Sequence, residues 1–219
     1  MKHVPHLVVR FDRQVGVLTD TQRSHLSKVL RIAEGGTVSY TDGSGIVGEG
    51  RYEFGVVVRG DETLVERPLP RVTLAVAPPR STDRLRFLVE KVVELGVDEI
   101  IWVRTQYGEG RVPSRSKLEA WTNGAVEQSR GGYVPIIGAA LRPISDLGGT
   151  DATVVGDQAG APLDGGDTGS TLTILIGPEG GWGPTDGVDG YPKVRFSHAV
   201  LRTETAAIAA LAILRSRAS

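Results

Sequence analysis

Two closely spaced prolines divide the chain into parts with different sequence patterns. Residues 66–70 read Glu-Arg-Pro-Leu-Pro. Each proline fixes its own φ and biases the residue before it towards extended geometry, so neither a helix nor a central strand is expected here. We interpret the segment as a linker. It predicts two domains, one over residues 1–67 and one over residues 71–219.

The first part has the pattern of a small β domain. Short runs of β-branched and aromatic residues alternate with Asp-Gly and Gly-rich turns, and one helical piece is expected at residues 21–31. Together these runs predict a small β-barrel. The expected strands span residues 6–11, 37–41, 46–47, 52–59 and 63–66.

In the second part, predicted strands and helices alternate, which favours a parallel sheet covered by helices. The last helix, 203–215, is apolar almost all round, and burial in a subunit interface is one explanation. The helix at 115–129 contains Gly124, and a glycine kept inside a helix usually indicates close packing. The expected strands are 72–77, 100–103, 152–156 and 172–176, and the remaining helix begins near Ser81 and ends at Gly96.

Composition excludes several kinds of chemistry. The chain has no cysteine, which rules out disulfides, a thiolate nucleophile and cysteine-ligated zinc. Its four histidines lack metal-ligand spacing with a carboxylate, so we expect no metal site. It has no apolar run near the roughly 18 residues of a membrane span and no signal peptide, so we expect a cytoplasmic protein. The net charge of −1 means that RNA binding needs a local basic patch.

A glycine motif in the first part suggests a dinucleotide site. Residues 43–48 match G-x-G-x-x-G, the fingerprint of nicotinamide cofactor binding. In that site a helix follows the glycines and presents its amides to a pyrophosphate. Here a strand-like segment, Glu49–Tyr52, follows instead. A β-hairpin with an Asp42–Gly43 turn is the better interpretation, with a nicotinamide oxidoreductase as a remote alternative.

The strongest functional signals are two turns in the second part. Residues 175–182, Leu-Ile-Gly-Pro-Glu-Gly-Gly-Trp, take a strand directly into a glycine-rich loop, where a parallel sheet binds ligands. A tight structural turn is the alternative. Residues 200–206 lead into a helix whose first turn offers Thr203 as a cap and Glu204 as a partner of the helix dipole. The free amides of that turn are also candidates to face a ligand.

Together these motifs resemble a known family. Residues 177–182 (GPEGGW), 200–207 (VLRTETAA), 91–97 (KVVELGV) and 127–130 (EQSR), with 25–31 (HLSKVLR), resemble the ribosomal RNA small subunit methyltransferase E family of the knotted SPOUT methyltransferases. The resemblance implies a PUA-like RNA-binding barrel, then an α/β domain with a C-terminal trefoil knot and a homodimer paired through the knot region. It also implies a cytoplasmic enzyme that uses S-adenosylmethionine to methylate N3 of a uridine in 16S rRNA of the small ribosomal subunit.

Site residues follow from the same resemblance. Because N3 of uracil must lose its proton before it attacks a methyl group, a carboxylate base or a cation that stabilises the anion is needed. The candidates for catalysis are Arg202 and Arg130 as cations, with Glu127 and Glu204 as a base or as partners that orient them; an Arg–Glu structural pair is the alternative for the glutamates. Cofactor binding is expected from Ala77, Pro78, Leu175, Ile176, Gly177, Glu179, Gly181, Ser197, Val200, Leu201 and Thr205, and RNA binding from His25, Lys28, Arg31 and Arg80.

One loop departs from the family pattern. Where the family commonly has Leu-Gly-x-Arg, residues 196–199 read Phe-Ser-His-Ala, so a glycine and an arginine are lost and Ser197 adds a side chain. Two further hypotheses therefore stay open. The chain is a methyltransferase of this fold acting on another RNA or position, or a non-catalytic RNA-binding or assembly protein that has kept the fold.

Overall fold

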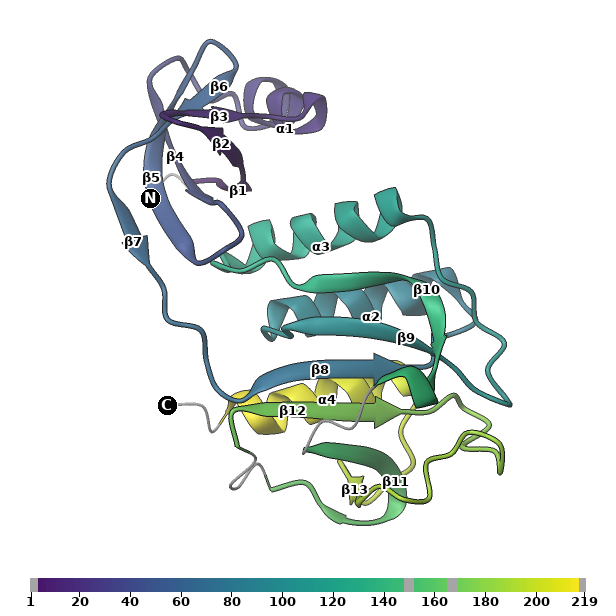
Figure 1. Cartoon of the computed structure of the whole chain (residues 1–219). Coiled ribbons are helices and arrows are strands. Elements are labelled where there is room, and N and C mark those ends of the chain that lie inside the picture. The colour runs from purple at the N-terminus through teal and green to yellow at the C-terminus, as the bar shows by residue number, and fades with distance from the viewer. Residues whose placement is uncertain (1–3, 148–151, 165–168, 217–219) are drawn as a thin grey trace. The chain divides into compact units, whose positions relative to one another are not determined.

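The structure is a computed structural model that describes residues 4–147, 152–164 and 169–216 (Figure 1). It divides into two compact units. The first comprises residues 1–67 and 123–134, and the second comprises residues 68–122 and 135–219. The segment 123–134, which the sequence analysis assigned to the second domain, thus belongs to the first unit. Among the described residues, no helix is both long and apolar enough to span a membrane.

The first unit is built on a sheet with seven described strands. The strand order is β1-β4-β5-β6-β3-β2, with β7 paired to β5. β1 runs parallel to β4 and the other pairs are antiparallel. The strands are β1 (His6–Val8), β2 (Arg10–Asp12), β3 (Val15–Val17), β4 (Gly36–Thr41), β5 (Ile46–Glu53), β6 (Val56–Val58) and β7 (Glu62–Leu64).

The predicted β4–β5 hairpin is confirmed. The Asp42 carboxylate accepts hydrogen bonds from the backbone N–H groups of Ser44 (2.7 Å) and Ile46 (3.2 Å), which closes the turn. Because β5 follows the glycines directly, no helix N-terminus stands there to hold a pyrophosphate. The structure thereby excludes the nicotinamide interpretation of this motif.

Two local predictions in this unit needed correction. The sequence analysis missed β3, a three-residue strand whose central Gly16 leaves space for the side chains of Val9 and Phe11. The predicted helical piece is α1 (Asp20–Ser24), which is capped by Thr19 and continues as a π-helix, His25–Val29.

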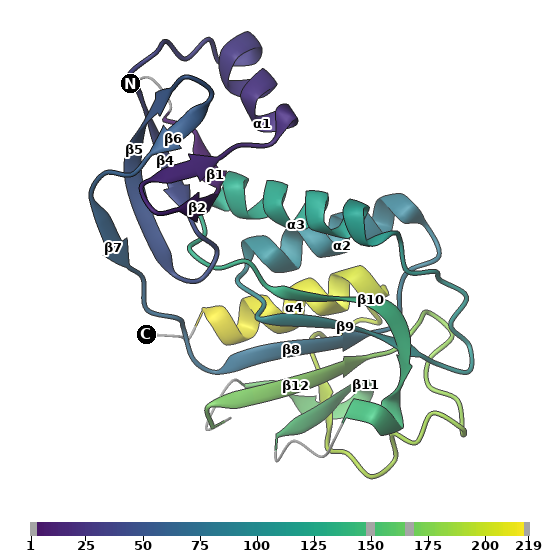
Figure 2. The same ribbon diagram turned by 45° about the horizontal axis from the view of Figure 1, so that its top comes forward.

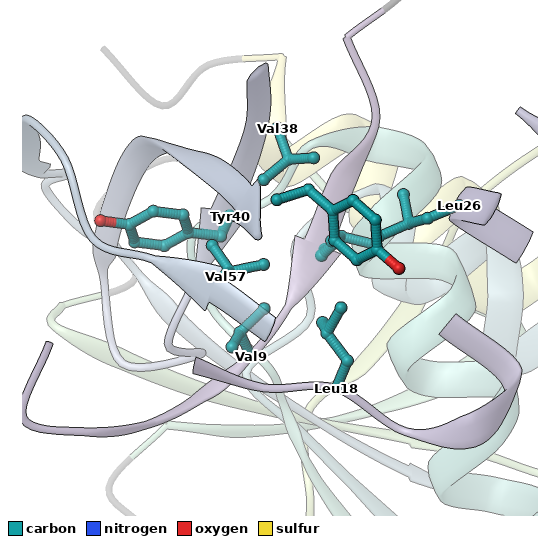
Figure 3. Packing of buried hydrophobic residues seen from close by; sticks show 8 residues of the cluster. Val9, Leu18, Leu26, Val38, Tyr40 and Val57 are labelled. Carbon is teal, nitrogen blue, oxygen red and sulfur yellow. The ribbon is translucent and has the colours of Figure 1, made fainter. Parts of the chain in front are cut away.

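The core of the first unit is apolar and contains two buried tyrosines, Tyr40 and Tyr52. Figure 3 shows Val9, Leu18, Leu26, Val38, Tyr40 and Val57 packed together. The Tyr40 hydroxyl donates to Glu62 (2.8 Å). Burial, reinforced by the Glu62 carboxylate, raises the pKa of Tyr40 to about 12, so the phenol stays protonated.

A buried histidine ties β1 to β4 and to the segment after α3 (Arg115–Ser129). His6 Nδ1 lies 2.8 Å from the Ser39 hydroxyl, and Nε2 lies 3.2 Å from the Gly131 carbonyl oxygen. The Arg130 guanidinium donates to the same hydroxyl (3.1 Å). Burial, together with the positive charge of Arg130, lowers the pKa of His6 despite its bond to the carbonyl. His6 is therefore neutral in the folded protein at pH 7.

This lowered pKa predicts an acid-sensitive first unit. The unfolded chain protonates His6 at its ordinary pKa of 6.5, whereas the folded chain resists protonation. The stabilisation of the folded protein by neutral His6 is therefore fully present above pH 6.5. It is lost as pH falls from there towards the lowered pKa of His6 in the folded protein. We expect the urea midpoint of the wild type to fall more between pH 7.5 and pH 5.5 than that of His6→Gln. Equal falls in both proteins would contradict this.

The second unit is built on a six-stranded sheet with parallel pairing throughout its described strands. The order is β10-β9-β8-β12-β11-β13. Helices α2 (Thr82–Glu94) and α4 (Thr203–Arg215) pack against each other on one face (Figures 1 and 2). The strands are β8 (Arg71–Val76), β9 (Glu99–Arg104), β10 (Ile136–Pro143), β11 (Thr153–Pro162), β12 (Thr171–Ile176) and β13 (Lys193–Arg195).

The sequence predicted the α/β class and the parallel sheet correctly but missed two strands. The expected alternation of strands and helices ends after α3. There β10, β11, β12 and β13 follow one another, and in the described residues between them the one helical element is a 3₁₀ turn, Ile144–Leu147. β10 has a register shift against β9, and β13 has three residues, so neither carries a clear strand pattern. The close packing expected of Gly124 is also wrong, since nothing lies within 4 Å of a Cβ built there.

Candidate functional site

A cavity of about 530 Å³ lies at the carboxyl ends of β12 and β13, beside the middle of β11. The carboxyl edge is where parallel α/β sheets bind ligands. Both turns that the sequence singled out line the cavity, together with the middle of β11 and the chain around β13. The lining residues are Gly156, Asp157, Gln158, Ile176, Gly177, Pro178, Glu179, Gly181, Trp182, Gly183, Pro184, Val188, Asp189, Lys193, Val194, Arg195, Phe196, Ser197, Ala199, Val200, Leu201, Thr203 and Ala206.

Trp182 fixes the shape of the glycine-rich turn. Its indole N–H donates to the Gly156 carbonyl within β11 (3.1 Å), so the ring folds back over the turn. A Cβ at Gly177 would lie 3.0 Å from that ring. A Cβ at Gly156 would lie 2.8 Å from the ring of Phe196 on the opposite wall. Both glycines are therefore required by close aromatic packing.

Thr203 joins the two turns directly. Its hydroxyl donates to the Gly177 carbonyl (3.0 Å), which links the start of α4 to the end of β12. The prediction that Thr203 caps α4 is therefore wrong. The N-cap is Arg202, whose side chain makes no capping hydrogen bond in the described structure. The Thr203 side chain instead satisfies a carbonyl of the neighbouring turn.

Arg84 of α2 links the same two turns by charge. Its guanidinium donates to both carboxylate oxygens of Glu204 on α4 (2.8 and 2.6 Å) and to Glu179 in the glycine-rich turn (2.6 Å). Glu204 is 6% exposed. A paired, hydrogen-bonded arrangement of this kind is what allows a charge to be buried. We call Arg84, Glu179 and Glu204 the arginine clamp.

The clamp keeps Glu204 ionised. Burial by itself raises the pKa of this carboxyl, but the hydrogen bonds from Arg84, its own backbone N–H and the nearby charges of Arg84 and Arg202 bring the pKa below its ordinary value. The same hydrogen bond from Arg84 to Glu204 raises the pKa of the Arg84 guanidinium, so both partners stay charged. Glu204 therefore forms a structural pair with an arginine, Arg84, which is the alternative that the sequence analysis gave for the glutamates.

Most of the residues predicted to bind a cofactor lie around the cavity. Leu175 and Ala77 form the apolar core beneath it, and the Ala77 N–H donates to the Ile176 carbonyl (2.9 Å). Pro78 is buried beside that strand end, whereas Thr205 is exposed on the first turn of α4. The predicted residues that line the cavity are Ile176, Gly177, Glu179, Gly181, Ser197, Val200 and Leu201.

The predicted catalytic residues fall in two groups. Arg202 is exposed between Leu201 and Thr203, and Glu204 is in the clamp; all belong to the second unit. Glu127 and Arg130 belong to the first unit. Glu127 accepts hydrogen bonds from the Gln22 side chain (2.7 Å) and the Val8 backbone (3.1 Å), so its described contacts are structural.

The predicted RNA-binding residues are on the surface of their own units. His25, Lys28 and Arg31 are exposed on and just after the π-helix of the first unit. In the second unit, the Arg80 guanidinium forms an exposed ion pair with Glu109 (2.8 Å).

Sequence reasoning missed the third wall of the cavity. Gly156, Asp157 and Gln158 belong to β11, a strand that was predicted but not placed beside the glycine-rich turn. The rule that ligands bind at strand ends applied to this strand as well and was the available signal. Arg84 gave no signal, because its partners are 95 and 120 residues away in sequence.

The described parallel sheet, with a ligand-sized cavity at its carboxyl edge, has the arrangement in which α/β proteins commonly bind small molecules. A family model described as an RNA methyltransferase domain matches residues 65–215. This is more than half of the chain, which therefore belongs to the RNA methyltransferase domain family. Within the described residues, no group of three or more His, Cys, Asp or Glu is placed to hold a metal ion.

Individual relatives confirm the resemblance expected from the sequence. The chain is 25% identical to ribosomal RNA small subunit methyltransferase E of Treponema pallidum (strain Nichols), covering 91% of this chain and 84% of the relative. A probable rRNA methyltransferase of Porphyromonas gingivalis superposes with a TM-score of 0.83 at 25% identity, over 97% of this chain and 99% of that one. A ribosomal RNA small subunit methyltransferase E of Neisseria gonorrhoeae, solved bound to S-adenosylmethionine, gives 0.82 at 25% identity, over 98% of each chain.

The clamp predicts a specific loss of stability. Arg84→Ala leaves the buried Glu204 carboxylate without its partner, and we expect a loss of about 2 kcal/mol in the free energy of unfolding, below the ~3–5 kcal/mol of a fully buried pair because Arg84 is partly exposed. Hydrogen exchange should rise at 177–182 and 203–206. The matched control is Arg86→Ala, which removes an exposed i,i+4 pair with Glu90 and should cost about 0.3–0.5 kcal/mol. Equal losses from both variants would contradict the clamp.

Proposed function

We propose that this chain is an S-adenosylmethionine-dependent methyltransferase that methylates N3 of a uridine in 16S rRNA of the small ribosomal subunit. The observation that carries the proposal is the one cavity lined by both turns that the sequence singled out, 175–182 and 200–206. Family membership and the names of the relatives support RNA as the substrate class.

The charges around the cavity fit a cationic cofactor. Asp157, Glu179 and Asp189 place carboxylates in its wall. Asp157 pairs with Lys193 (3.0 Å) and Glu179 pairs with Arg84 (2.6 Å), so Asp189 is the lining carboxylate outside an ion pair among the described residues. This carboxylate would attract a positive charge such as a sulfonium.

The size and the apolar surface of the cavity also fit S-adenosylmethionine. Its volume of about 530 Å³ lies within the roughly 300–1,000 Å³ of small-molecule sites. Trp182 and Phe196 contribute aromatic rings, whose faces attract cations. Ile176 and Leu201 give apolar surface for an adenosine moiety.

The chain's own residues position and activate the RNA. S-adenosylmethionine supplies an electrophilic methyl group, so the protein must orient the uracil and stabilise the anion formed when N3 loses its proton. Arg202 follows the cavity-lining residue Leu201, and its side chain is exposed. We therefore assign to Arg202 the role of stabilising the negative charge that develops on the uracil oxygens, or of binding a phosphate. Arg130 is proposed to make a further contact with RNA. Glu127 and Glu204 are proposed to hold structure and not to accept the proton.

We also propose an RNA-binding barrel, a trefoil knot and a homodimer for this chain. We assign the domain of residues 1–67 to a PUA-like barrel that binds RNA through His25, Lys28 and Arg31, with Arg80 adding a contact from the second domain, 71–219. The path from β12 through β13 at the sheet edge and back to α4, which packs on β8 and β12, supports a trefoil knot. A homodimer paired through this region would cover the exposed Val200. The enzyme would act in the cytoplasm, on ribosomal RNA.

A non-catalytic RNA-binding protein is the second candidate, because the loop 196–199 departs from the family pattern. The Gln158 side chain amide donates to the His198 carbonyl (2.7 Å), and the Ser197 hydroxyl accepts from the Ala199 N–H (3.1 Å), so this loop is held in place. Isothermal titration with S-adenosylmethionine separates the two candidates. Binding supports the enzyme, and its absence favours the non-catalytic protein.

The substrate is tested by methyl transfer. The purified protein is incubated with labelled S-adenosylmethionine and small ribosomal subunits from a strain that lacks the gene. We expect label in 16S rRNA and a reverse-transcription stop at one uridine, because a methyl group on N3 blocks Watson–Crick pairing. Label that enters only transfer RNA would overturn the substrate assignment.

Arg202→Ala should separate catalysis from folding. Arg202 caps α4 only through its backbone, so the variant should keep the unfolding midpoint of the wild type. We expect turnover to fall at least tenfold, equivalent to about 1.4 kcal/mol of lost transition-state stabilisation. The exposed Arg86→Ala serves as the control. An unchanged rate in Arg202→Ala would remove this residue from the catalytic set.

A further inference from the structure

Residues with a Cβ rarely adopt a left-handed backbone, and in the described part of this chain they do so only in the first unit. The φ angles are positive at Arg13 (54°), Arg31 (51°), Phe54 (49°) and Arg130 (58°). For such residues this conformation is less stable than the right-handed one, because Cβ comes too close to the following carbonyl oxygen. All four side chains are exposed. Three are arginines and one is aromatic, the types that contact single-stranded nucleic acid.

Phe54 sits in a turn that disfavours its residue type, and its side chain contributes little to the folded core. It forms the two-residue turn between β5 and β6 with Gly55, whose φ is also positive at 81°. A two-residue hairpin with positive φ at both positions is a type I′ turn, which favours Asn-Gly. The Phe54 side chain is 91% exposed, so its ring gains almost nothing from folding. The turn is therefore strained for a residue that the core does not use.

The backbone beneath the ring is nevertheless held firmly. The Phe54 N–H donates to the Glu34 carboxylate (2.7 Å). A Cβ at Gly55 would lie 3.4 Å from Cδ of Arg23, which places the α1 side chain against the turn. Arg23 is itself fixed by its bond to the Leu18 carbonyl (2.8 Å). The hairpin thus presents one aromatic ring to solvent on a fixed support.

We propose that Phe54 stacks on an unpaired base of the RNA substrate. Every base has a π face, and stacking on an aromatic side chain contributes about 1–3 kcal/mol per base. A ring with only two χ angles on a fixed turn loses little conformational entropy when it binds. The exposed left-handed arginines of the same unit favour RNA over a protein partner, because they add phosphate-binding cations. This inference rests on the proposed function of the chain as an RNA methyltransferase.

The test measures both the affinity for RNA and the stability of variants at position 54. Phe54→Asn suits the turn better, so its unfolding midpoint should equal or exceed that of the wild type. Its Kd for protein-free 16S rRNA should be weaker by about fivefold or more, which corresponds to the lower end of the stacking range. Phe54→Trp keeps a stacking ring and should bind within about twofold of the wild type. Leu64→Asn, at a 71% exposed site in ordinary strand geometry, is the matched control and should bind like the wild type.

Distinct outcomes overturn distinct claims. If Phe54→Asn binds the RNA as tightly as the wild type, the stacking role is wrong while the proposed function stands. The same holds if Phe54→Trp binds as weakly as Phe54→Asn. If Phe54→Asn loses affinity for intact small subunits but not for protein-free RNA, the ring contacts a ribosomal protein and the inference is overturned. If the wild type neither binds nor methylates rRNA, the proposed function fails and this inference fails with it.

Discussion

The joint between the end of β12 and the start of α4 is the constraint on which the candidate site depends. The Thr203 hydroxyl holds the Gly177 carbonyl, and Arg84 pairs with Glu179 on one side and Glu204 on the other. Either turn alone is a short loop at a sheet edge. Held together, they become two walls of one cavity, and the buried charge of Glu204 makes separating them costly.

The parallel sheet explains why the walls meet at this edge. β12 lies between β8 and β11, so the loop after β12 passes beside β11, where the Trp182 indole N–H donates to the Gly156 carbonyl. Parallel strands all end on the same side, which gathers distant loops without requiring them to be close in sequence. Glycines at 156 and 177 then allow aromatic rings to pack against the backbone.

Local patterns predicted much of this structure, and long-range contacts account for the rest. The bounds of α3 and α4 and the strand β12 follow from periodicity and turn residues. The first functional turn was recognised from its glycines, and the second from Thr203 and Glu204 at the start of a helix. The strands β10 and β13 are defined by their partners and not by their own residues, so no local pattern indicates them. Likewise, the sequence offered Thr203 as a helix cap, because a hydroxyl at a helix start is equally suited to either role until the neighbouring carbonyl is known.

The most direct measurement is a crystal structure of this protein grown with S-adenosylmethionine. Our account predicts electron density for the cofactor between the 177–182 turn and the 196–201 loop, with the Thr203–Gly177 hydrogen bond and the arginine clamp intact around it. Density for the cofactor at another place on the chain, or a cavity closed by Trp182 and Phe196 in saturated crystals, would contradict the account.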